Sequence, residues 1–99
     1  MNAQEQHAEL TRLLRAGIVV VEAEHGGTPA EWPLLLARSV HTSVNKVLGA
    51  TMTLSHLIAL LVQADVAQRG QAPGADWPSW YAGWMQERYR HNRPGLSAE

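Results

Sequence analysis

Apolar residues recur at helical spacing in four segments of the chain, and glycine-containing breaks separate these segments. In the first segment they fall at intervals of three and four, which is the spacing of one face of an α-helix; they are Leu10, Leu13, Leu14, Ile18 and Val21. At most one stretch of the chain is a candidate strand, whereas a β-rich fold needs several. The spacing therefore predicts an all-α fold.

Helix-ending residues follow the first three apolar segments. Glycine reaches the left-handed backbone conformation that ends many helices. Gly26-Gly27 and Gly49 are therefore expected to end the first and second helices, and Gly70 to stop the third.

Residues that begin helices precede the later segments. Thr53 and Asp76 are side-chain types that accept hydrogen bonds from the first backbone N–H groups of a helix. The stretch TPAE (28–31) reads as a capping box with proline at the first helical position. Because Pro33 would clash inside an established helix, either a one-turn helix precedes a kink or the second helix begins near Trp32.

The segment GIVVVEAE (17–24) is also compatible with a short strand, because β-branched residues favour strands. The apolar stripe continues through it without a change of phase, which favours a helix. The expected helices cover approximately 3–25, 31–48, 53–69 and 77–91. Short connections between four helices predict an antiparallel bundle, with residues 24, 33, 69 and 77 at one end.

Length and composition restrict the class of protein. The 99 residues suit a single helical domain over 1–99, with short disordered ends expected at 1–3 and 94–99. A net charge of −1 lacks the basic surface that nucleic acids and anionic membranes attract. The N-terminus carries no secretory pattern, and the longest apolar run (54–62) is too short to span a bilayer. The absence of cysteine fits a reducing compartment, so a cytoplasmic location is expected.

Three of the four tryptophans lie within the stretch DWPSWYAGWMQERYR (76–90). At about 100° per residue, one side of the expected fourth helix carries Trp77, Trp80, Tyr81, Trp84, Met85 and Arg88. The other side carries Ser79, Ala82, Gly83 and Gln86. Such a stripe either fills a core or, in part, contacts another chain, because interfaces are enriched in Trp, Tyr, Met and Arg. We expect Trp80 and Trp84 to point inward, and Trp77, Tyr81 and Arg88 to form an interaction surface.

Four polar residues lie on or beside the apolar stripes, where an enzyme would place its catalytic groups: Glu24, His41, Asp65 and Arg88. With a rise of about 1.5 Å per residue, they fall at different heights in an antiparallel bundle. Asp65 is level with Trp80 and Tyr81, so an indole N–H or a phenol O–H is its expected partner. As an alternative, His41, Asp65, Tyr81 and Trp84 would line a small-ligand pocket.

Motifs for metals, cofactors and nucleic acids are weak. The five histidines include no i, i+4 pair on one helix, no serine–histidine pair has the context of a nucleophile, and no glycine-rich loop suits a phosphate. The sequence therefore predicts no metal, no cofactor and no catalytic residue. The segment 43–61 resembles a helix-turn-helix in outline, but TLSHLIALL (53–61) has no side chain suited to read base edges and is expected to be a core helix.

Leu34, Leu35 and Leu60 lie off the main apolar faces, and surplus apolar surface on a small domain favours dimerisation. The leading hypothesis is a non-enzymatic protein that acts through protein–protein contacts, as a homodimer and with another protein as a further candidate partner. The alternative is a small-ligand-binding bundle or minor enzyme with the pocket described above. A DNA-binding regulator ranks third.

Overall fold

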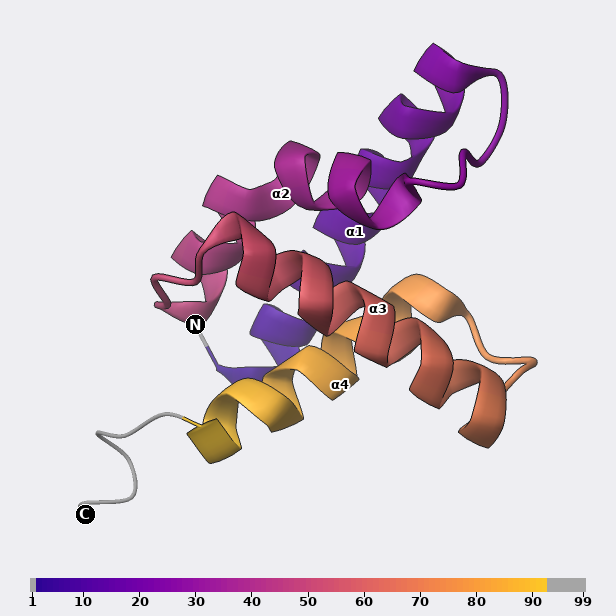
Figure 1. Ribbon diagram of the computed structural model, residues 1–99. Coiled ribbons are helices and arrows are strands. Elements are labelled where there is room, and N and C mark those ends of the chain that lie inside the picture. The colour runs from indigo at the N-terminus through magenta and orange to yellow at the C-terminus, as the bar shows by residue number, and fades with distance from the viewer. Residues whose placement is uncertain (1, 93–99) are drawn as a thin grey trace.

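Four helices account for the secondary structure of residues 2–92, the part of the chain that this computed structural model describes (Figure 1). They are α1 (Ala3–His25), α2 (Trp32–Leu48), α3 (Leu54–Gln71) and α4 (Trp77–Asn92). The predicted all-α fold is confirmed, with helix bounds that differ by at most two residues from those expected. Segment 17–24 is helical. Of the ends expected to be disordered, only residues 2 and 3 are described: Asn2 caps α1 and Ala3 is its first residue. Residues 1 and 94–99 lie outside the described range.

Local signals explain where α1 begins and where α1 and α2 end. Asn2 and Glu5 form a reciprocal capping box at the start of α1. Gly26 and Gly49 end α1 and α2 with positive φ angles of 69° and 66°, as predicted, because glycine adopts the left-handed conformation without a steric penalty.

The alternative in which α2 begins near Trp32 is confirmed, whereas two expected boundary signals, the TPAE cap and the Gly70 stop, are wrong. The TPAE stretch does not cap α2, which begins at Trp32 with no side-chain hydrogen bond from Glu31. Pro33 then lies in the first turn of α2, where backbone N–H groups have no partner within the helix, so the lack of an N–H in proline costs no hydrogen bond. Gly70 does not stop α3, which continues to Gln71 because Gln68 Nε2 donates to the Ala72 carbonyl oxygen at 2.7 Å and satisfies the helix end.

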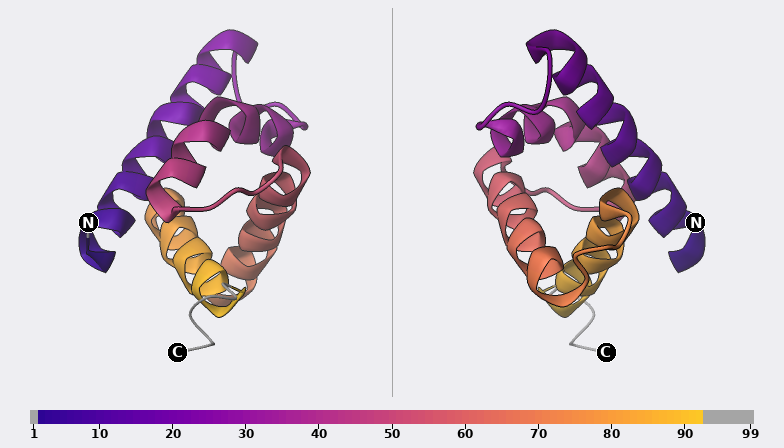
Figure 2. Two further views of the ribbon diagram at one scale, coloured as in Figure 1. Left: turned by 90° about the vertical axis from the view of Figure 1, so that its left-hand side faces the viewer. Right: turned by 90° about the vertical axis from the view of Figure 1, so that its right-hand side faces the viewer.

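The four helices form a closed ring in which each packs on its sequence neighbours and α4 returns to α1 (Figure 2). In these views α3 and α4 diverge as a V, so these two helices cross steeply.

The residue that caps α3 is the expected one, since Thr53 Oγ1 accepts a hydrogen bond from the His56 backbone N–H at 3.1 Å. The core draws on all four helices and includes Leu10, Leu14, Leu36, Val44, Leu57, Leu61 and Met85.

Gly17 allows α1 and α2 to approach closely. A Cβ atom added at Gly17 would lie 2.8 Å from Leu36 Cδ1 and 2.8 Å from Val40 Cγ1. Both side chains are buried in the core. The absence of a side chain at this position therefore sets the distance between the two helices.

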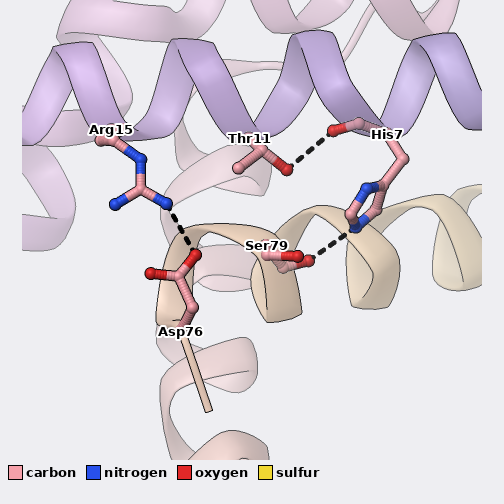
Figure 3. Close-up of polar contacts among 5 residues, drawn as sticks. All are labelled: His7, Thr11, Arg15, Asp76 and Ser79. Atoms are coloured by element: carbon pink, nitrogen blue, oxygen red, sulfur yellow. Dashed lines mark hydrogen bonds and ion pairs between the residues drawn. The ribbon is translucent and has the colours of Figure 1, made fainter.

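Polar contacts join the start of α4 to α1 (Figure 3). The His7 ring donates from Nε2 to the Ser79 carbonyl oxygen at 2.8 Å, and the Arg15 guanidinium pairs with Asp76 at 2.7 Å. Gly83 faces the same His7 ring. The start of α4 therefore lies opposite Arg15, not opposite residue 24 as expected, and the C-terminal turns of α1 project beyond it (Figure 1).

Candidate functional site

The buried face of α4 is rotated from the one that the aromatic stripe indicated. Pro78, Tyr81, Ala82 and Met85 are buried, and Ala82 and Met85 are fully inaccessible to solvent. The indoles of α4, at Trp77, Trp80 and Trp84, are only partly buried. Trp80 and Trp84, which were expected to point inward, do so only in part: both pack against the core and keep part of each indole exposed.

Trp80, Trp84 and Arg88 follow one another at intervals of four and share a face of α4. We call these three residues the α4 ridge. The Arg88 guanidinium lies 4.6 Å from the centroid of the Trp84 ring, within the range of a cation–π contact. The ridge therefore presents indole surface with a cation already stacked on it, and Arg88 itself is exposed.

Tyr81 does not belong to an exposed surface, because only 3% of it is accessible to solvent. Its hydroxyl donates to Asp65 Oδ1 at 2.9 Å, which confirms the partner expected for Asp65. Burial, followed by this hydrogen bond, raises the pKa of Tyr81 above the usual value of 10.0, so the phenol remains a donor at neutral pH. On its other side, Asp65 pairs with Arg69 one turn along α3.

All four helices contribute to a pocket of about 220 Å³ beside this pair. We call it the aromatic pocket. Trp77 and Tyr81 of α4 and Trp32 of α2 supply its rings, and Ile18, Glu22, Thr28, Asp65 and Gln68 complete the lining. Of the expected pocket residues, Asp65 and Tyr81 therefore lie together, whereas Trp84 belongs to the α4 ridge.

The three rings of the aromatic pocket contact one another through Tyr81. The Trp77 and Tyr81 centroids are 4.8 Å apart with planes inclined at 61°, an edge-on arrangement, and those of Trp32 and Tyr81 are 6.4 Å apart at 38°. Such pairs are favourable beyond the area they bury. Sequence reasoning missed Trp32 as a pocket residue, and the only available signal was that a large ring stands at the start of a helix.

His41 lies outside the aromatic pocket and organises the connection between α2 and α3. Its Nε2 atom donates to the Met52 carbonyl oxygen at 2.6 Å, and Asn45 bonds both the N–H and the carbonyl of Met52 at 3.0 Å. These bonds satisfy backbone groups in a connection that has no helix of its own. The expectation that His41 lines the pocket is therefore wrong.

The remaining polar residues do not gather at one point. Glu24 is exposed near the end of α1. Within residues 2–92, no three His, Asp or Glu side chains form a group that could hold a metal ion.

Two further expectations concern apolar residues. Leu57 and Leu61 are fully buried, so segment 53–61 is a core helix as expected. Leu60 is also buried, at 7% exposed, and offers no surplus surface; Leu34 is 38% exposed. Across the described helices, none is long and apolar enough to cross a membrane.

Comparison of the chain with known family models, curated proteins and solved structures found no match.

Proposed function

We propose that this protein is a non-enzymatic helical module that associates with a second copy of itself through the α4 ridge. The supporting observation is that Trp80 and Trp84 remain partly exposed on one face of α4, with Arg88 stacked on Trp84. Tryptophan and arginine are the residues that most often carry the binding energy of an interface. Stacking also holds the Arg88 side chain in place, which reduces the entropy lost on binding.

The spacing of the ridge favours a second copy as the partner. A two-fold symmetric interface pairs each residue with its counterpart across the axis. If the axis passes near Trp84 and the two α4 helices run antiparallel, Arg88 of each copy meets Trp80 of the other, because both residues stand four positions from Trp84. The symmetric arrangement therefore creates two further cation–π contacts from residues already on the surface.

The overall charge does not oppose this association. Each copy carries a net charge of only −1, so repulsion between two copies is small. We also propose a cytoplasmic location for this association, because a chain without cysteine has no disulfides that a reducing compartment would break. Association with a different protein is the alternative, and the following experiment distinguishes it from self-association.

We expect Trp80→Ala and Arg88→Ala each to weaken dimerisation about tenfold, which corresponds to about 1.4 kcal/mol, because each removes an anchor of the interface. Arg88→Ala is expected to change folding little because Arg88 is exposed, whereas Trp80→Ala also costs some stability because Trp80 packs partly buried against the core. Sedimentation equilibrium gives the dimerisation constant, and thermal melts of the same samples give stability.

Arg12→Ala is the matched control, because Arg12 is exposed on α1 and pairs only with the neighbouring Glu9 among the ion pairs of residues 2–92. It leaves dimerisation unchanged. A wild-type protein that stays monomeric at high micromolar concentration contradicts self-association. Equal dimerisation by all three variants instead contradicts the assignment of the α4 ridge.

A further inference from the structure

The aromatic pocket combines rings and carboxylates in a way that the proposed self-association does not use. Trp32, Trp77 and Tyr81 form part of its wall, and Glu22 and Asp65 bring two carboxylates to it. Arg69 pairs with Asp65 from a largely exposed position, which leaves an excess of one negative charge at the site. We propose that the aromatic pocket binds a small organic cation bearing a quaternary ammonium group.

The sign of the charge follows from the lining. An anion would approach two carboxylates, whereas a cation is attracted both by them and by the negative faces of the rings. The three rings come from two helices, and the inclination of Trp77 to Tyr81 at 61° means that they present walls in different directions. A site bounded by rings that face different directions suits a roughly spherical cation.

The hydrogen bonding of the lining favours a cation that donates no hydrogen bonds. Asp65 already accepts from Tyr81 and pairs with Arg69, and Glu22 accepts from the Thr28 hydroxyl. Gln68 donates its amide to the Ala72 carbonyl. Among the described residues, every buried side-chain nitrogen and oxygen has a partner, so the pocket offers charge and ring surface without a group that requires a bond from the ligand.

The size of the aromatic pocket restricts the ligand further. Its volume of about 220 Å³ lies below the roughly 300–1,000 Å³ of sites for drug-sized molecules. A methylated ammonium head group with a short polar tail therefore fits better than a larger aromatic cation.

A titration with choline tests this proposal, with uncharged 3,3-dimethylbutan-1-ol as an isosteric probe and sodium chloride as the ionic-strength control. Indole N–H resonances in two-dimensional NMR spectra report binding residue by residue. We expect choline at millimolar concentrations to shift the Trp32 and Trp77 resonances in a saturable way. The alcohol and the salt should have much smaller effects, because only choline combines a positive charge with an apolar trimethylated head group.

Two pairs of variants locate the site. We expect Glu22→Gln to weaken choline binding about two- to fivefold, as loss of a partly exposed charge does, and Glu24→Gln, on the exposed end of the same helix, to leave it unchanged. Trp77→Leu weakens binding about fivefold or more through loss of a ring, whereas Trp84→Leu does not.

Three outcomes overturn the proposal: no saturable shift with choline, equal binding of the uncharged alcohol, or equal effects of Glu22→Gln and Glu24→Gln. If Trp77→Leu does not fold, the two glutamate variants still decide the question, because neither side chain belongs to the core. The dimerisation constant is measured separately, so failure of the cation site leaves the proposed self-association intact, and the reverse also holds.

Discussion

Replacing Met85 with alanine is expected to lower the free energy of unfolding by about 2–5 kcal/mol, the range for truncating a long buried side chain. Met85 is fully buried and contacts the core where α4 closes the ring of helices. Its loss leaves a cavity that steeply crossing helices cannot easily collapse, because each is held by two neighbours. Urea denaturation followed by circular dichroism measures the change.

Trp84→Ala is the informative comparison, because Trp84 is larger but only partly buried. We expect it to cost about 1–2 kcal/mol, since part of its surface already contacts water and its removal opens no enclosed cavity. A larger loss for Trp84→Ala than for Met85→Ala would show that α4 is rotated toward the face that the aromatic stripe indicated, with Trp84 in the interior.

Gly17→Leu is expected to destabilise the fold by about 3 kcal/mol, at the upper end of the usual cost of overpacking. Even the first atom of the new side chain would lie 2.8 Å from both Leu36 and Val40. Val40 is β-branched and stiff at χ1, and both neighbours are buried, so α1 and α2 must separate. The same denaturation experiment measures this effect.

Gly70→Leu is the matched control, because Gly70 is also helical but a Cβ atom added there would point into open space. Leucine favours the helix over glycine by up to about 1 kcal/mol, so this variant is expected to be slightly more stable than the wild type. A neutral or stabilising effect of Gly17→Leu would contradict the close approach of α1 and α2.

The number, type and bounds of the helices could be read from the sequence because their signals are local. An apolar stripe needs only residues three and four positions apart, and a cap such as Thr53 or Gly49 acts within one turn. The two wrong signals, the TPAE cap and the Gly70 stop, show that a sequence pattern does not rank competing local signals. At Gly70 the side chain of Gln68 extends α3 by satisfying a carbonyl beyond the glycine.

The candidate site could be predicted only in part. Asp65 and Tyr81 lie on the contacting helices α3 and α4, and helix length and rise were enough to expect them at the same height. Helix length and rise per residue do not give the direction in which a side chain leaves its helix. His41 turns to the connection after α2, whereas Trp32 turns into the aromatic pocket.

The sequence by itself determined four helices and their order, because caps and periodicity are properties of neighbouring residues. Only the tertiary structure decided which way α4 faces. Its stripe of large side chains, from Trp77 to Arg88, is wide enough that several rotations of the helix would each bury apolar surface. Close contact of α1 with Ser79 and Gly83 selects one of these rotations. That contact buries Ala82 and Met85 and leaves Trp80 and Trp84 partly exposed, because small residues allow two helix backbones to approach where indoles would hold them apart.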